Sequence, residues 1–430
     1  MYKEFEKVLI LGSDFGTYDL AMEAKKMGLY VIAADLMDMS PTKRVADEAW
    51  QISTTDLDTL EAKIIEEKIN GILTGASEFN IENCRALCKR LGMPVYCESD
   101  RAWGVARNKY EFKKMCHECG APVAKDYYLS DALTRDELDK IEYPVVVKPV
   151  DMSGNRGMSF CYNEEELIKG YKYARELSDN DHIVVERMLE GPEYTGYYVL
   201  ADGEVKLSYY TSAHHQTGEL ANLYSFEDIT SCHLKQYMEE VDEGIKKVFK
   251  KAGCKEGICW IECMYDKDGH FYVLEMGYRF AGPVLYPIHE RLSGFNTYKW
   301  MIECALGVKH TKDQLPEKWP VFKKCAVSYN LFTNTEGVID KIEGLDEIIA
   351  LPNIVVDIPK REGDSVRYHA NMGVVRIFGE SCDEMCKTAE FVNDKLFIKN
   401  SQGENMFIKY DDFESIKEEY EEGLREFDLL

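Results

Sequence analysis

The chain has 430 residues, of which 45% are hydrophobic, and this is enough for two to four domains with sizeable cores. Its 77 acidic residues outnumber the 52 basic residues, and the formal net charge of −25 argues against nucleic acid or an anionic membrane as a partner. No stretch approaches the roughly 18 consecutive apolar residues of a membrane span.

The 14 cysteines bear on the cellular compartment. They show no spacing typical of a disulfide framework, so we expect a protein of the reducing cytoplasm. Cys116 and Cys119 form a C-x-x-C pair, but Gly120 ends the predicted helix directly after them, whereas a redox pair usually lies where a helix begins. We interpret the cysteines as buried or inert, with metal or redox chemistry as the alternative.

The first hundred residues alternate between strand and helix patterns. Short apolar runs predict strands, and segments with apolar residues at helical spacing follow them. This alternation predicts a parallel, doubly wound sheet, which is a Rossmann-like domain over residues 1–106. The predicted strands are 7–12, 30–35, 71–76 and 94–97, and the predicted helices are 13–28, 57–69 and 79–92.

The rest of the chain mixes helices with hairpins. Residues 107–120 predict a helix, and residues 266–269, DKDG, predict the turn of a hairpin. The last part, 320–430, combines short strands, turns and helices, and we interpret it as a third region. The remaining predicted elements are strands at 121–129 and 143–150, a strand-rich stretch at 183–218 and a helix at 239–253.

A lysine and a loop of small residues follow the strand PVVVKPV. Lys148 comes after three valines, and a buried ammonium group needs an anion nearby. In the loop SGNRG, Ser153, Gly154 and Gly157 let backbone N–H groups approach phosphate oxygens, and Arg156 adds positive charge. The segment predicts a loop that closes over the phosphates of ATP. The alternative is a surface turn with an incidental lysine.

Two acids lie on the arms of the predicted hairpin around DKDG. Glu262 and Glu275 each follow apolar residues, and their spacing places them opposite each other across two strands. Two facing carboxylates repel each other unless a cation neutralises them, and Mg²⁺ is the hard ion that prefers such oxygens. The pair predicts a site for Mg²⁺ or Mn²⁺ next to bound phosphates, and the alternative is two edge acids that face solvent.

In this order, the motifs resemble the ATP-grasp superfamily of ATP-dependent ligases over nearly the full length of the chain. The motifs are Lys109 in RNKYEFKK, Lys148 before SGNRG, the segment VERMLEGPE, and then Glu262, Glu275 and Arg279. The resemblance implies an α/β and α+β chain with a Rossmann-like domain at 1–106. An ATP-grasp domain of two α+β lobes that clamp ATP would follow at 107–319, with a small lid lobe at about 121–190, and a C-terminal α+β region at 320–430.

The resemblance also implies roles for individual residues. Lys109 and Lys148 would bind the ATP phosphates, Glu186 and the backbone of Arg187, Met188 and Leu189 would meet the adenine, and Glu193 would bind the ribose. Glu262 and Glu275 would hold the metal. Arg279 would contact the substrate carboxylate or its phosphorylated form, with a structural ion pair to Glu290 as the alternative. His214 and His215 fall where the family lines the substrate side, and the alternative for them is a loop cap.

One position departs from the family pattern. The family usually has E-[IVM]-N-x-R on this strand, with the Asn as a further metal ligand, whereas this chain has EMGYR with Gly277 in the Asn position. Glycine offers no side-chain oxygen, so the second metal would depend on Glu275 and water.

The R-F-A-G segment that follows resembles the branch of the superfamily that contains the L-amino-acid ligases. We therefore expect a cytoplasmic carboxylate–amine ligase that uses ATP and joins small molecules through an acyl phosphate. The expected partners are a small-molecule carboxylate and an amine, with a homodimer as the assembly to test. Enzymes like biotin carboxylase or carbamoyl-phosphate synthase, which activate bicarbonate, are the alternative, and a non-catalytic nucleotide-binding regulator is a third.

Overall fold

The computed structural model describes residues 6–13, 16–150, 157–178, 180, 182–216, 223–282, 285–316 and 320–430. It is a mixed α/β structure, as the sequence predicts. In the described residues, no helix is both long and apolar enough to cross a membrane.

The N-terminal part contains a four-stranded parallel sheet in the order β3-β2-β1-β4. The parallel sheet confirms the interpretation of the strand–helix alternation. Helices cover both faces because each buried strand leads into an amphipathic segment. The elements are β1 (Lys7–Leu11), α1 (Thr17–Lys26), β2 (Tyr30–Ala34), α2 (Pro41–Val45), β3 (Glu48–Trp50), α3 (Leu57–Glu67), β4 (Gly71–Thr74), α4 (Glu78–Leu91) and α5 (Asp100–Arg107).

The predicted strand at 94–97 is wrong. No strand forms there, because this segment packs against the later hairpin instead of extending the parallel sheet. The Tyr96 carbonyl accepts a hydrogen bond from the Tyr278 hydroxyl at 2.8 Å, and the Tyr96 side chain lies against Gly257.

A small three-stranded antiparallel sheet, in the order β6-β5-β7, follows the next helix. Asn108 begins that helix, because its side chain accepts from the Glu111 N–H at 3.0 Å, and Gly120 ends it with φ of 76°. The elements are α6 (Lys109–Cys119), α7 (Arg135–Leu138), β5 (Val145–Pro149), β6 (Ser159–Cys161), α8 (Glu164–Leu177) and β7 (Ile183–Arg187).

The predicted strand at 121–129 is also wrong. The segment makes only two isolated bridges, from Val123 to Val273 and from Asp126 to Glu186. These two partners belong to different sheets, so the segment crosses from one sheet to the other and joins neither as a strand.

The largest sheet has eight strands in the order β12-β11-β8-β9-β10-β13-β18-β16. One face packs on α5, α6 and α10, and the other packs on α1, α11 and α12. The elements are β8 (Glu193–Ala201), β9 (Glu204–His215), β10 (Tyr224–Ile229), α9 (Leu234–Tyr237), a π-helical turn (Met238–Asp242), α10 (Glu243–Ala252), β11 (Gly257–Tyr265), β12 (Phe271–Gly277), α11 (Tyr286–Ser293), α12 (Thr297–Ala305) and a 3₁₀ turn (Lys312–Gln314).

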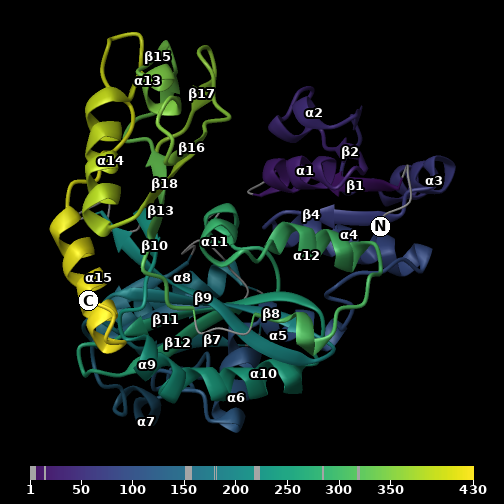
Figure 1. The fold of residues 1–430 in the computed structure, drawn as a ribbon. Helices are drawn as coiled ribbons and strands as arrows, with labels where there is room; N and C mark the ends of the chain where they lie inside the picture. The colour runs from purple at the N-terminus through teal and green to yellow at the C-terminus, as the bar shows by residue number, and fades with distance from the viewer. Residues whose placement is uncertain are drawn as a thin grey trace.

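The C-terminal residues complete this sheet. Strands β13, β18 and β16 extend it, and α14 and α15 lie on the side away from the N-terminal sheet (Figure 1). The division at residue 320 therefore falls within one continuous sheet, and the domain boundaries stay a prediction. The elements are β13 (Cys325–Phe332), β14 (Gly337–Val338), β15 (Lys341–Glu343), α13 (Leu345–Ile349), β16 (Ile354–Asp357), β17 (Ser365–Val366), β18 (Asn371–Gly379), α14 (Cys382–Lys395), β19 (Phe397–Lys399) and α15 (Phe413–Glu426).

Candidate active site

Two acids from neighbouring strands meet at the centre of the site. Glu262 on β11 and Glu275 on β12 are direct cross-strand partners, which confirms that they face each other. Burial raises the pKa of Glu262 well above its usual value, and the charges of Glu275 and then Glu193 raise it further. This repulsion is what a divalent cation between the carboxylates would relieve, so the residues fit a magnesium ion.

Helix α6 brings two lysines to the site, and one of them meets the pair of acids. The Lys109 ammonium lies 3.1 Å from the Glu275 carboxylate. Lys113, one helical turn later, is buried and pairs with Asp126 at 2.8 Å and with Glu186. The sequence interpretation did not include Lys113, although its i+4 spacing from Lys109 places both on one face of the helix.

Lys148 on β5 supplies the third ammonium group. It forms an ion pair with Glu186 of the adjacent strand β7, and only 14% of its side chain is exposed. Burial lowers the pKa of Lys148 to about 7, and the neighbouring charges of Lys113 and Lys109 contribute. Glu186 is therefore a shared counterion for two lysines, and its predicted contact with adenine stays a prediction.

The structure explains Gly277. It is the direct cross-strand partner of Trp260, and a Cβ atom at Gly277 would lie 2.1 Å from the indole ring. No side chain fits there without displacing the tryptophan. Trp260 thus fills the space in which a ligand from this position would have to lie, and β12 supplies the single carboxylate of Glu275 to the pair.

Arg279 connects the site to the N-terminal sheet. Its guanidinium lies 3.2 Å from the Glu78 carboxylate on α4 and 4.9 Å from the centre of the Trp260 ring. The structural ion pair that was the alternative does form, but its partner is Glu78 and not Glu290, which accepts from the Asn296 amide at 2.9 Å. The predicted contact between Arg279 and a substrate carboxylate stays a prediction.

His214 and His215 do not act as a pair, because adjacent residues of β9 point to opposite faces of the sheet. His214 faces α15 and lies 2.7 Å from Asp228. Burial lowers the pKa of His214, but the hydrogen bond with Asp228 and the negative charges of Asp228, Glu419 and Asp412 together outweigh it, so the net shift is upward. Only His215 shares the face with the two acids, and its ring lies 3.1 Å from the Glu193 carboxylate. The expectation that His214 lines the substrate side is therefore wrong.

A further acid on this face was missing from the sequence interpretation. Glu227 on β10 shares a cross-strand row with Glu193, through Ala213 between them. Its Oε1 accepts from the Tyr197 hydroxyl at 2.9 Å and from the Thr211 hydroxyl at 2.8 Å. Its Oε2 is buried and has no hydrogen-bond partner within the described part of the chain. Burial raises the pKa of Glu227 to about 7. An acid inside an apolar strand pattern, YSFEDI, is the signal that could have identified it.

The other predicted residues have less defined roles. Ser153, Gly154 and Arg156 lie outside the described residues, whereas Gly157 is described and has φ of 78°. The side chain of Arg187 forms an ion pair with Asp266 at 2.9 Å. The N–H groups of Arg187 and Met188 donate to the carbonyls of Lys125 and Pro144, so these two N–H groups are already used within the protein. The adenine contacts predicted for this segment, Leu189 included, stay a prediction.

A comparison with protein-family models matches residues 108–312 to the carbamoyl-phosphate synthase L chain ATP-binding domain. Residues 108–312, which hold the lysines and acids described above, are therefore similar to this ATP-binding domain. The expected resemblance to ATP-grasp ligases is confirmed.

Curated relatives align with large parts of this chain. The small subunit of 2-oxoglutarate carboxylase from Hydrogenobacter thermophilus is 24% identical over 326 residues, which cover 70% of this chain and 67% of that protein. The chain spans 32% to 58% of the length of seven further curated relatives. These enzymes therefore contain regions that have no counterpart in the aligned part of this chain.

Solved structures with the ATP-grasp domain extend the likeness to most of the chain. The L-amino acid ligase from Bacillus licheniformis aligns over 95% of this chain and 100% of that one, at a TM-score of 0.72 and 19% identity. The biotin carboxylase domain of the Hydrogenobacter thermophilus enzyme aligns over 90% of this chain and 90% of that one, at a TM-score of 0.72 and 20% identity. That structure was solved as a dimer in complex with MgADP, ADP and bicarbonate. At these identities the likeness shows the fold alone.

Proposed function

We propose that this chain is an ATP-dependent carboxylate–amine ligase that forms an amide bond between small molecules, with amino acids as the substrate class. A carboxylate oxygen attacks the γ-phosphorus of ATP, which gives an acyl phosphate and ADP. An amine then attacks the acyl carbon, phosphate leaves, and the amine gives up a proton. The observation that carries the proposal is the facing pair Glu262 and Glu275 with Lys109 and Lys148 beside it.

The first step needs charge neutralisation more than covalent catalysis. Lys109 and Lys148 would bind the phosphates of ATP, and Glu262 and Glu275 would hold Mg²⁺ or Mn²⁺. When bound, the metal would neutralise charge that develops on the phosphate oxygens. The guanidinium of Arg279 would orient the substrate carboxylate through two parallel hydrogen bonds, while Glu78 on α4 holds it in place.

The second step needs a group that accepts the proton of the amine. Glu227 fits this role because its pKa is raised to about 7, near the value that suits a general base at neutral pH. Tyr197 and Thr211 hold one of its oxygens, and the other oxygen has no partner among the described residues. We assign Glu227 as the residue that receives the proton.

A second candidate function is the activation of bicarbonate, which the similarity to 2-oxoglutarate carboxylase favours. It would use the same lysines and acids and place bicarbonate where the carboxylate binds. Release of ADP that requires bicarbonate and no amine would identify this function.

A screen of amino acids and dipeptides, scored by phosphate release and by mass spectrometry of the product, tests the ligase function. Lys148→Ala and Glu275→Ala should abolish ADP release. Lys250→Ala, which removes an exposed lysine on α10 that pairs with Glu204, is the matched control and should keep it. Near wild-type ADP release from either site variant would contradict the assignment.

A further inference from the structure

A second group of potential metal ligands lies outside the ATP-grasp site. Glu256 precedes β11, Cys304 lies in the last turn of α12, and His310 follows that helix. One ligand atom of each lies within 4.8 Å of the others. His310 is 2% exposed and Cys304 is 6% exposed, so two of the three side chains belong to the interior, and Glu256 is half-buried beside them.

The distance between two of these atoms matches tetrahedral coordination. The sulfur of Cys304 lies 3.7 Å from Nδ1 of His310. A zinc ion with usual Zn–S and Zn–N bond lengths and a tetrahedral angle separates its sulfur and nitrogen ligands by about 3.6 Å. The two side chains therefore already have the separation that a bound ion requires.

The other ring nitrogen of His310 has the partner that is typical of a metal-binding histidine. Nε2 lies 3.0 Å from the Glu303 carboxylate. Because Nε2–H donates to this carboxylate, the lone pair of the neutral ring is on Nδ1, which faces Cys304. A carboxylate that orients a histidine in this way usually accompanies a metal ion bound to the other nitrogen.

Glu256 supplies an independent observation. Its Oε2 is buried and has no hydrogen-bond partner in the part of the chain that the structure describes. A buried carboxylate oxygen without a partner is costly, and a bound cation would satisfy it. Glu256 and Cys304 also line a cavity of about 270 Å³ against residues 92–98, which leaves room for water as a fourth ligand.

We propose that Glu256, Cys304 and His310 bind one divalent transition-metal ion of the zinc class, with a fourth position open to the cavity. This site is distinct from the Glu262 and Glu275 pair. Glu256 and Glu262 are six residues apart along an extended strand, or about 20 Å. The ion would fasten the end of α12 to the start of β11. Its ligands would include the sulfur of Cys304, whereas the Glu262 and Glu275 pair offers only oxygen ligands.

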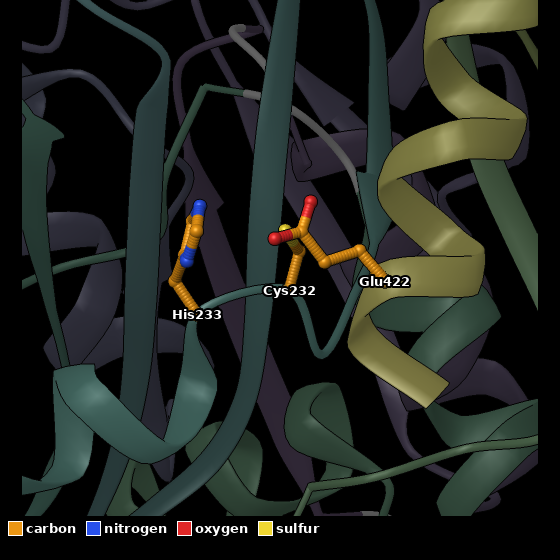
Figure 2. Close-up of side chains that lie close together, drawn as sticks. All are labelled: Cys232, His233 and Glu422. Atoms are coloured by element: carbon orange, nitrogen blue, oxygen red, sulfur yellow. The ribbon is translucent and has the colours of Figure 1, made fainter. Parts of the chain in front are cut away.

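Another group, Cys232, His233 and Glu422, also brings three such side chains together (Figure 2). Glu422 is exposed on α15, and the His233 ring stacks on Tyr265 with a centroid distance of 4.0 Å. Its Nδ1 lies 3.9 Å from Glu426, which is too long for the orienting hydrogen bond that His310 has. This group serves as the matched control.

Cobalt substitution tests the proposal on the full-length protein. After metal is removed with a chelator, Co²⁺ is added and the absorption spectrum is recorded together with the metal content. We expect one thiolate-bound Co²⁺ per chain, seen as a sulfur-to-cobalt charge-transfer band. An ion at Glu262 and Glu275 would give no such band, because its ligands are oxygens, so the result does not depend on the ligase function.

Variants then locate the ion. Cys304→Ser should abolish the band, Glu256→Gln should weaken Co²⁺ binding by about tenfold or more, and Cys232→Ser should leave both unchanged. Glu256→Gln keeps the shape of the side chain, so it decides the question if Cys304→Ser does not fold. A wild-type protein without the band, or a band that Cys232→Ser removes and Cys304→Ser keeps, would overturn the proposal.

Discussion

Raising the pH from 7 to 9 should weaken ATP binding through Lys148. Burial, together with the charges of Lys113 and Lys109, lowers the pKa of Lys148 to about 7 in the protein without nucleotide. A triphosphate attracts the protonated ammonium far more strongly than the neutral amine. Binding therefore raises this pKa and takes up a proton, and the affinity should fall as the pH exceeds 7.

The size of the effect follows from this pKa. At pH 7 about half of the molecules carry a protonated Lys148, and at pH 9 about 1% do. If ATP binds only the protonated form, the apparent Kd should rise by about 50-fold between these two values, which corresponds to about 2.3 kcal/mol.

Titration calorimetry with Mg-ATP measures both parts of this prediction. Buffers with different ionisation enthalpies report the proton uptake, and the same titrations give the Kd at each pH. Lys148→Arg is the matched control, because a guanidinium stays charged at pH 9. Burial also lowers the pKa of Lys113, so Lys113→Met separates its contribution. A change in the wild-type Kd of less than about threefold, or an equal change in Lys148→Arg, would refute the reasoning.

Three further predictions concern the face of the sheet that carries the site. Burial raises the pKa of Glu227 to about 7, so its contribution to stability is present below about pH 4.5 and is lost as the pH rises through 7. Between pH 5 and 8, wild type should lose about 2.5 kcal/mol more unfolding free energy than Glu227→Gln, and parallel urea-unfolding profiles would contradict this. Arg279→Lys should keep the Kd for ATP but lose product formation by about a hundredfold, or about 2.7 kcal/mol. An equal loss in Glu78→Gln would indicate that Arg279 acts through its ion pair with Glu78 and not through contact with the substrate. Gly277→Asn should lower stability by about 1–3 kcal/mol without tighter Mg-ATP binding, and the same substitution should cost less in a Trp260→Ala background, where the indole no longer fills the space; a stable single variant would contradict the packing argument.

Local patterns in the sequence determined much of this protein. The strand–helix alternation of the first hundred residues requires a parallel sheet, because each buried strand must be followed by a helix that covers it. The hairpin around DKDG was also predicted from the sequence, but a bulge between Glu262 and Cys263 shifts its register by one residue. This bulge, which the sequence did not reveal, places Glu262 opposite Glu275 and Trp260 opposite Gly277. The separation of His214 from His215 was present in the sequence, because adjacent residues in a strand face opposite sides.

Only the tertiary structure decided which distant charges meet. Lys113 and Glu186 are 73 residues apart, and Arg279 and Glu78 are 201 residues apart. No local pattern specifies such pairs, because they depend on how α6 and α4, which pack on different sheets, are placed relative to the strands of the site. The same holds for Glu256, which comes close to His310 only because α12 ends beside the start of β11. Propensity and periodicity act over a few residues, whereas the electrostatics of a buried site depend on every element that is packed around it.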